Sequence, residues 1–263
     1  MVIPAAQKIL LTGASRGIGA TIARVLAKPG RALYLAARTR EALYGTARAC
    51  TERGATVQTF AVDLADVESV QGFASRIRDE FGGVDLLVNN AGVLGPEALP
   101  WEADLDAWWE TQLVNLRAPF ILQKVLVPGM IARGGGRIID LSSGAAVRDD
   151  DLCSSYFVSK TALLRLAGSL HLAGKEHGLK VFPVAPGVVR TDMTSGMQMH
   201  IGREIWNEPT EVAELIAAIA DGELDGIAGA QIRAGSDKLA DLKELSEKQI
   251  ADDDSRKLRL SDW

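Results

Sequence analysis

The chain has 263 residues, of which 47% are hydrophobic and 24% charged, and its formal net charge is −5. This composition is typical of a globular protein, and the negative charge argues against a nucleic-acid partner. The apolar runs are short, so no segment is expected to cross a membrane, and residues 1–8 lack the pattern of a signal peptide. Two cysteines, Cys50 and Cys153, make no disulfide framework, and we expect a cytoplasmic location.

Short apolar runs alternate with helical patterns along the chain. The expected strands cover residues 9–11, 31–37, 57–62, 84–88, 137–141, 179–184 and 230–233. The expected helices cover residues 20–26, 41–53, 67–81, 105–132, 154–177 and 211–220. Strands that alternate with helices specify a parallel sheet, and near-continuous apolar runs are typical of strands covered on both faces. We therefore predict an α/β fold of the Rossmann type, with a doubly wound parallel sheet and helices on both faces in a single domain.

A glycine-rich turn, with Gly13, Gly17 and Gly19, joins the first expected strand to the first helix. Glycines at such a turn let the backbone approach a pyrophosphate at the helix N-terminus, where free N–H groups point outward. The Gly-x-x-x-Gly-x-Gly spacing differs from the standard dinucleotide-binding pattern, and by itself it also fits a simple tight turn. Its place in the first strand–helix unit favours dinucleotide binding.

Arg38 follows the second expected strand directly, where this topology places the adenosine ribose. An acidic residue there would bond the 2′-hydroxyl group and repel a 2′-phosphate. The guanidinium groups of Arg38 and of Arg16, in the glycine turn, can instead clamp a phosphate. The pattern favours NADP(H), with NAD(H) still possible; the alternative is that Arg38 is an ordinary surface charge.

Tyr156 and Lys160 lie one turn apart on one face of an expected helix. A cation beside a phenol lowers its pKa because it favours the charged form, which suits Tyr156 to general acid catalysis near neutral pH. A tyrosine and a lysine at this spacing also occur by chance, so other residues are needed to support an active site. Ser143 closes the fifth strand, where active-site groups of open α/β sheets gather. Asn115 lies inside a long helix, where asparagine is unusual, and fits either an active site or a structural hydrogen bond.

Together these motifs resemble the classical short-chain dehydrogenases/reductases over about residues 7–235. The motifs that carry the resemblance are residues 12–19, Asp63 and Leu64, residues 89–92, Asn115, Ser143, Tyr156 and Lys160, and residues 186–191. The resemblance implies an oxidoreductase that interconverts a carbonyl and an alcohol by hydride transfer, with a small molecule as its substrate.

The resemblance also implies the roles of four catalytic residues. Tyr156 would donate the proton to the carbonyl oxygen, which Ser143 would hold by a hydrogen bond. Lys160 would lower the pKa of Tyr156 and bond the nicotinamide ribose. Asn115 would order a water that connects Lys160 to solvent.

The cofactor-binding roles come from the same resemblance. Asp63 would bond the adenine amino group, Asn89 and its neighbours would line the adenosine side, and Thr191 with the backbone of Val189 would fix the carboxamide. No metal is expected. The expected cofactor-binding set is Gly13, Ser15, Arg16, Gly17, Ile18, Gly19, Arg38, Asp63, Leu64, Asn89, Ala91, Gly92, Tyr156, Lys160, Pro186, Gly187, Val189 and Thr191.

Two segments near the expected substrate side depart from the family pattern. The expected substrate lid, about residues 192–208, is short and rich in methionine, which suits an adaptable apolar wall or simple packing. Three acids at residues 149–151 follow Arg148; they would repel an anion or attract a cation, although a solvated loop is the simpler interpretation. Cys153 is interpreted as a packing residue.

A charged extension, residues 236–263, follows the expected dinucleotide-binding and catalytic domain at residues 1–235. Leu239, Leu242, Leu245 and Ile250 give it an apolar stripe that needs a surface, on its own body or on a neighbouring subunit. The resemblance implies a homodimer or homotetramer. Two other hypotheses remain: a noncatalytic dinucleotide-sensing protein on the same fold, against which the intact Asn-Ser-Tyr-Lys set argues, and an epimerase or dehydratase on a related fold.

Overall fold

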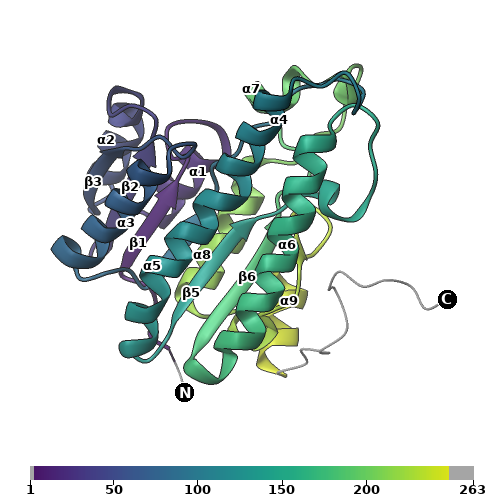
Figure 1. Ribbon diagram of the computed structural model, residues 1–263. Helices are drawn as coiled ribbons and strands as arrows, with labels where there is room; N and C mark the ends of the chain where they lie inside the picture. Colours follow the sequence, from purple (N-terminus) through teal and green to yellow (C-terminus); the bar gives the residue numbers. More distant parts are fainter. Residues whose placement is uncertain (1–2, 249–263) are drawn as a thin grey trace.

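Seven parallel strands form a central sheet in the computed structural model, which describes residues 3–248 (Figure 1). The strands are β1 (Lys8–Thr12), β2 (Ala32–Ala37), β3 (Thr56–Ala61), β4 (Leu86–Asn89), β5 (Gly136–Leu141), β6 (Leu179–Ala185) and β7 (Ile232–Arg233). Their order is β3-β2-β1-β4-β5-β6-β7, and every neighbouring pair is parallel. The predicted doubly wound sheet of the Rossmann type is confirmed.

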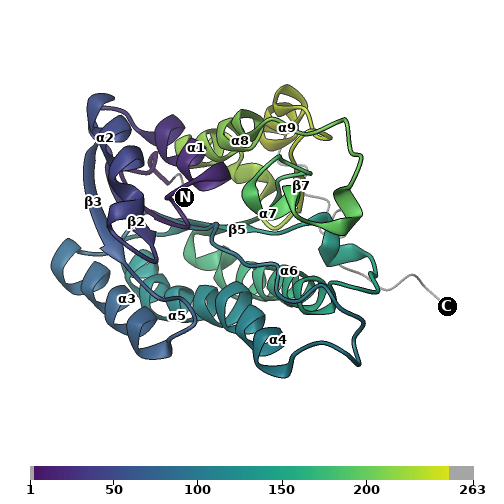
Figure 2. The same ribbon diagram turned by 90° about the horizontal axis from the view of Figure 1, so that it is seen from above.

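Helices cover both faces of this sheet, as Figure 2 shows. One layer contains α1 (Gly17–Leu26), α2 (Tyr44–Glu52), α8 (Pro209–Asp221) and α9 (Leu239–Glu247). The opposite layer contains α3 (Val67–Phe81), α4 (Leu105–Gln112), α5 (Ala118–Ala132) and α6 (Ser154–Gly174). A short helix, α7 (Asp192–Ser195), follows β6. In the described part of the chain, no helix has both the length and the apolar character needed to cross a membrane.

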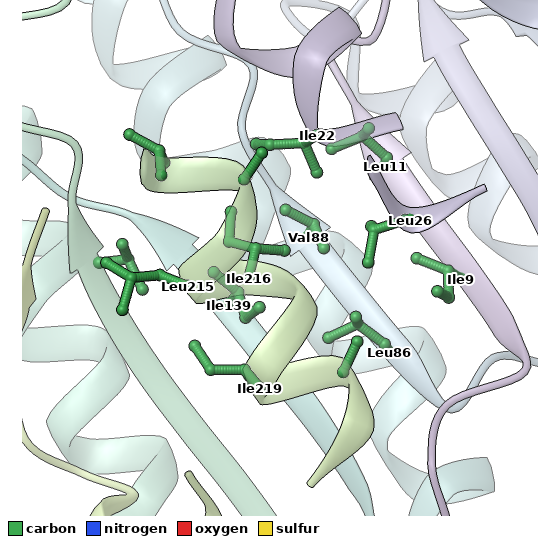
Figure 3. Close-up of a cluster of buried hydrophobic side chains, with 14 of the residues drawn as sticks. Ile9, Leu11, Ile22, Leu26, Leu86, Val88, Ile139, Leu215, Ile216 and Ile219 are labelled. Atoms are coloured by element: carbon green, nitrogen blue, oxygen red, sulfur yellow. The ribbon is translucent and has the colours of Figure 1, made fainter. Parts of the chain in front are cut away.

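Alternate residues of the central strands face the two helical layers. Ile9 and Leu11 of β1 belong to a buried cluster with Leu26 of α1 and Ile216 of α8 (Figure 3). Leu10, between them in the sequence, belongs to a second buried cluster on the side of α3 and α5. Both faces of the strand are therefore buried, which explains why the sequence there is continuously apolar rather than alternating.

The helix expected over residues 105–132 is interrupted in the structure. A π-helical turn, Leu113–Arg117, separates α4 from α5, and the N–H of Ala118 donates to the carbonyl of Leu113, five residues earlier. Pro119 contributes to the break because it has no N–H for the α-helical bond to the carbonyl four residues before it. The wider turn contains Asn115, so the break shapes the region where a functional residue is expected.

The apolar stripe of the C-terminal extension packs on the body of the same chain. Leu242 of α9 is 2% exposed and belongs to the cluster between α1 and α8, with Leu239 and Leu245 packed against that cluster. Ser246 Oγ accepts a hydrogen bond from the N–H of Gly226 (3.0 Å). Of the two surfaces considered for the stripe, the structure shows the chain's own body; Ile250 lies outside the described residues.

Candidate functional site

A cavity of about 1050 Å³ lies along the carboxyl-terminal edge of the sheet. Its walls come from residues that follow the six strands β1 to β6. The strand order reverses between β1 and β4, at the centre of this edge, and open α/β sheets bind ligands at such a switch point. Every residue of the expected cofactor-binding set lines this cavity except Asn89.

The glycine turn between β1 and α1 is held against the chain that follows β4. Thr12 Oγ1 accepts hydrogen bonds from the N–H groups of Asn90 (3.1 Å) and Ala91 (3.2 Å). The Asn90 side chain donates to the carbonyls of Thr12 (2.9 Å) and Gly13 (3.1 Å). Gly13 has a φ of +67°, and a Cβ there would lie 2.8 Å from Cα of Ala91. A Cβ on Gly19 would collide with the Gly13 carbonyl, so the close backbone approach requires glycine.

Asn89, which the sequence analysis expected on the adenosine side, does not itself line the cavity. It is the last residue of β4, is 3% exposed, and donates from Nδ2 to Asp140 Oδ1 (2.8 Å) on β5. Its neighbour Asn90 lies at the cavity wall instead.

Arg38 and Arg16 line the same cavity, and both are exposed. Arg38 follows β2, where an acid would face a cofactor ribose in this topology. Nη1 of Arg16 lies 3.0 Å from Oδ2 of Asp192, and both side chains of this ion pair are more than two-thirds exposed. Such a pair contributes little stability, so it is easily exchanged for another anion. Asp63 is also exposed, and its Oδ1 accepts a hydrogen bond from the N–H of Ala65 (2.9 Å).

Ser143 and Tyr156 both line the cavity wall. Ser143 follows β5 and begins the 3₁₀ turn Gly144–Val147, where its Oγ accepts the N–H of Ala145 (3.1 Å). Tyr156 lies in the first turn of α6 and is partly exposed. Burial raises the pKa of the Tyr156 phenol, the hydrogen bond with Ser143 opposes this rise, and the nearby Cys153 thiol adds to it.

Lys160 lies one turn further along α6 and is 4% exposed. Its Nζ donates to the carbonyl of Leu141 (2.7 Å) and lies 5.6 Å from the centroid of the Tyr156 ring. Burial lowers the pKa of Lys160 to about 8, while the charge of Asp140 opposes this shift. The role expected of Lys160, to lower the pKa of Tyr156, stays a prediction.

A buried carboxylate, Asp140 of β5, joins this group although the sequence analysis did not single it out. It is 0% exposed and accepts hydrogen bonds from Nδ2 of Asn89 (2.8 Å) and Nε2 of Gln123 (3.0 Å). Burial raises the pKa of Asp140 to about 6, against the effects of Asn89, Gln123 and the Lys160 charge. Asp140 could have been singled out from the sequence, because it is an acid within the expected strand 137–141, all of whose residues are buried.

Asn115 is buried in the π-helical turn and does not line the cavity. Its Oδ1 accepts the N–H of Val93 (2.8 Å), and its Nδ2 donates to the Val93 carbonyl (2.8 Å) and to Ser159 Oγ (3.0 Å). Asn115 therefore connects the chain after β4 to α6. A Cβ added to Gly92 would lie 3.3 Å from Asn115 Oδ1 and 3.6 Å from Lys160 Nζ, so both polar atoms lie near one point of the cavity wall.

The segment after β6 supplies Pro186, Gly187, Val189 and Thr191 to the cavity wall. Thr191 caps α7, since its Oγ1 accepts the N–H of Thr194 (3.2 Å), and Thr194 Oγ1 donates to the Val189 carbonyl (2.6 Å). These bonds fix the backbone of the segment and stabilise the start of α7. The expected carboxamide-binding groups therefore lie on a locally well-ordered turn.

The opposite end of the cavity is lined by side chains from the chain after β5 and from residues 192–208. They include Arg148, Phe157, Asp192, Met193, Thr194, Met197, Met199 and His200. Met197 is 5% exposed and packs with Cys153 and Phe157. This methionine therefore both lines the cavity and packs against the body of the protein. Burial and nearby acids raise the pKa of the Cys153 thiol to about 12, which agrees with a packing role. Among residues 3–248, no cluster of three His, Cys, Asp or Glu side chains could hold a metal ion.

Comparison with known proteins agrees with this arrangement. The model of the short chain dehydrogenase family matches residues 7–201. The 3-oxoacyl-[acyl-carrier-protein] reductase FabG of Vibrio cholerae is 32% identical over 230 residues, which cover 84% of this chain and 92% of that protein.

Two solved structures are similar along most of their length. A metagenomic short-chain oxidoreductase in complex with NADP is 34% identical, with a TM-score of 0.71 over 82% of this chain and 90% of the other. A gluconate 5-dehydrogenase from Burkholderia cenocepacia, in complex with NADP and tartrate, is 25% identical, with a TM-score of 0.77 over 88% of this chain and 94% of the other. The chain therefore belongs to the family of short-chain dehydrogenases, oxidoreductases that use a nicotinamide dinucleotide.

Proposed function

We propose that this protein is an NADP(H)-dependent oxidoreductase that interconverts a carbonyl and an alcohol, with Tyr156 as the general acid or base. The observation that carries the proposal is that Ser143, Tyr156 and Lys160 line one cavity, with Lys160 Nζ 5.6 Å from the centroid of the Tyr156 ring. A phenol, a hydroxyl and an ammonium group at one wall supply a proton donor, an oxygen-binding group and a positive charge.

The turn after β1 fits the phosphates of a dinucleotide. Helix α1 begins at Gly17, its N-cap residue Arg16 makes no side-chain cap, and its first N–H groups are therefore free to bind phosphate oxygens. The closely approached glycines Gly13 and Gly19 leave the space that a side chain would fill. When bound, the nicotinamide ring supplies or accepts the hydride.

In the reducing direction, Tyr156 donates its proton to the oxygen of the substrate carbonyl, and the Ser143 hydroxyl bonds the same oxygen. The ammonium group of Lys160 favours the phenolate that remains, because opposite charges attract more strongly in a buried site than in water. We also propose that Asn115 Oδ1 and Lys160 Nζ, which converge near Gly92, hold a water that returns a proton from solvent.

The preference for NADP(H) rests on the two guanidinium groups of Arg38 and Arg16 at the cavity wall. No acid follows β2 to bond a ribose 2′-hydroxyl group, since Ala37 and Arg38 occupy these positions. NADP in the two solved structures described above supports this choice. A cytoplasmic homodimer or homotetramer, with a lid at about residues 192–208, remains part of the proposal.

The test combines a panel of ketones and aldehydes with a matched pair of tyrosine variants. Tyr156→Phe removes only the hydroxyl group, so turnover of NADPH should fall roughly 10²–10⁴-fold while NADPH binding, followed by fluorescence titration, persists. Tyr44→Phe is the control, because Tyr44 is 63% exposed and does not line the cavity. Near-normal turnover by Tyr156→Phe would refute the assignment.

NADPH binding by the unmodified protein without turnover of any carbonyl would support the noncatalytic dinucleotide-sensing alternative instead.

A further inference from the structure

The loop after Ser143 carries one basic residue and three acids, and the structure separates them. Arg148 lines the large cavity, whereas Asp149, Asp150 and Asp151 do not. Asp150 Oδ1 accepts the N–H groups of Leu152 (3.0 Å) and Cys153 (2.7 Å), so this acid is engaged in the local turn. The side of the loop that faces the cavity is therefore positive, although the loop as a whole is acidic.

The guanidinium group of Arg148 is held next to the residues expected to do chemistry. Its central carbon lies 5.8 Å from the centroid of the Phe157 ring, and Phe157 directly follows Tyr156. Among the described residues, no carboxylate lies within ion-pair distance of Arg148. A stacked guanidinium group without a protein carboxylate keeps its hydrogen-bond donors available for a ligand.

His200 adds a polar group to the same end of the cavity. It is 8% exposed, lines the cavity, and packs edge-on against Trp206 with 5.8 Å between ring centroids. Its Nδ1 is buried and has no hydrogen-bond partner among residues 3–248. Burial lowers the pKa of His200, and the charges of Arg203 and Arg148 lower it further. The Met199 backbone and the charge of Glu97 act in the opposite direction.

Apolar side chains fill the space between these polar groups. Met193, Met197 and Met199 line the cavity at this end and can adapt to the shape of an aliphatic or alicyclic ligand. Of the acids around this end, Glu97 accepts the N–H of Gln198 with its Oε1 (3.0 Å) and does not line the cavity. Asp192 and Glu110 do line the cavity, and Asp192 is paired with Arg16. A ligand at this end therefore meets an apolar wall and a positive group.

We propose that the substrate is an oxo acid, or the corresponding hydroxy acid, whose carboxylate binds the guanidinium group of Arg148 and accepts a hydrogen bond from His200. This inference rests on the proposed function and adds a substrate class to it. Arginine suits the role because its planar guanidinium group binds a carboxylate through two parallel hydrogen bonds. The methionines would contact the carbon chain between the carboxylate and the reacting carbonyl.

The test uses oxo acids of increasing length, 4-oxopentanoate, 5-oxohexanoate and 6-oxoheptanoate, each paired with its methyl ester. The ester keeps the carbonyl and the chain and removes the charge. For the unmodified protein, kcat/KM with NADPH should favour the acid over the ester for at least one length. In Arg148→Gln, kcat/KM for that acid should fall about 10- to 100-fold, as expected for a charge-assisted bond, while the ester is unaffected.

Two further variants separate docking at Arg148 from general electrostatics. Arg203→Gln removes an exposed positive charge that also acts on His200 but does not line the cavity, and the acid-to-ester ratio should not change. His200→Phe keeps the ring and removes its hydrogen bond, so the ratio should fall, but less than in Arg148→Gln. An equal fall in Arg203→Gln would overturn the proposed role of Arg148, and an unchanged ratio in His200→Phe would overturn that of His200.

The outcomes also distinguish this inference from the proposed function. Turnover of the esters with no preference for any acid would overturn the inference and leave the proposed function intact. If no carbonyl is turned over, the proposed function fails, and calorimetric titration of the NADP⁺-loaded protein with the same oxo acids decides the inference. Binding that Arg148→Gln abolishes would support the carboxylate site, and absence of binding to the unmodified protein would overturn it.

Discussion

Replacing Asp140 by asparagine should stabilise the protein near neutral pH but not near pH 4. Burial raises the pKa of this carboxyl group from its ordinary value of 3.8 to about 6 in the folded protein. Below pH 3.8 the group is protonated in both states and has no effect. Between pH 3.8 and 6 the folded state holds more protons than the unfolded state, so stability falls as the pH rises, and above pH 6 the penalty is constant.

The size of this penalty follows from the difference between the two pKa values. At about 1.36 kcal/mol for each pH unit, it corresponds to about 3 kcal/mol of unfolding free energy. Asparagine has the same shape and no charge, so it removes this penalty. The Nδ2 group of the new residue needs a hydrogen-bond acceptor. Asn89 Oδ1 can become that acceptor if the Asn89 amide turns over, because this oxygen is buried and has no hydrogen-bond partner among the described residues.

Urea denaturation of the unmodified protein and of Asp140→Asn between about pH 4 and pH 7 measures this effect. The difference in unfolding free energy between the two proteins should grow by about 3 kcal/mol in favour of the variant as the pH rises. Asp149→Asn, at an exposed position, is the matched control and should show no such growth. A difference that is independent of pH would refute the reasoning, whatever the variant gains or loses through its hydrogen bonds.

The same substitution should also alter the pH dependence of turnover. The charge of Asp140 raises the pKa of Lys160, so its removal should lower that pKa below about 8. If the ammonium form of Lys160 supports the reaction, the alkaline limb of the pH–rate profile moves to lower pH. The variant would then be more stable but active over a narrower range, which a purely structural role of Asp140 would not produce.

Two further substitutions test the cofactor site and the C-terminal helix. Arg38→Ala should weaken NADPH binding by about 1.5–3 kcal/mol and leave NADH binding unaffected in fluorescence titrations. Arg40→Ala is the control, and equal losses for both cofactors in Arg38→Ala would contradict the assignment. Leu242→Ala should lower the unfolding free energy, measured by urea denaturation, by about 2–5 kcal/mol, because Leu242 is 2% exposed in the core cluster. A change below about 1 kcal/mol would show that α9 packs loosely.

The order of elements was predictable from the sequence because both faces of the sheet are buried. Continuous apolar runs such as Ala32–Ala37 are typical of strands covered on two sides, and the helices between them indicate a parallel arrangement. The interruption around Asn115 had one signal in the sequence, Pro119, which lacks the N–H for an α-helical bond. The partner of Asn115 had none, since the side chain of Asn115 bonds both backbone groups of Val93, which is distant in sequence.

The cavity wall was predictable from motifs, but the direction of individual side chains was not. The pair Asn89 and Asn90 illustrates the limit: either residue could face a ligand until the sheet register places Asn89 opposite Asp140. Arg148 and His200 lie far apart in the sequence, and no spacing rule relates them. Only the fold brings the loop after β5 and the segment after β6 to the same end of the cavity.

Asp140 was overlooked for the opposite reason, since the sequence does contain a signal for it. An acid in the fully buried strand Gly136–Leu141 breaks the apolar pattern that otherwise defines the sheet, and burial penalises its charge. Lys160, buried beside the carbonyl of Leu141, breaks the pattern of α6 in the same way. Departures from local rules that cost stability tend to occur at functional sites. Asp140 lies at the end of β5, just before Ser143 in the sequence, and Lys160 lies one turn after Tyr156 on α6. Both residues are therefore next to the pair proposed to carry out the reaction, where a chemical role would justify that cost.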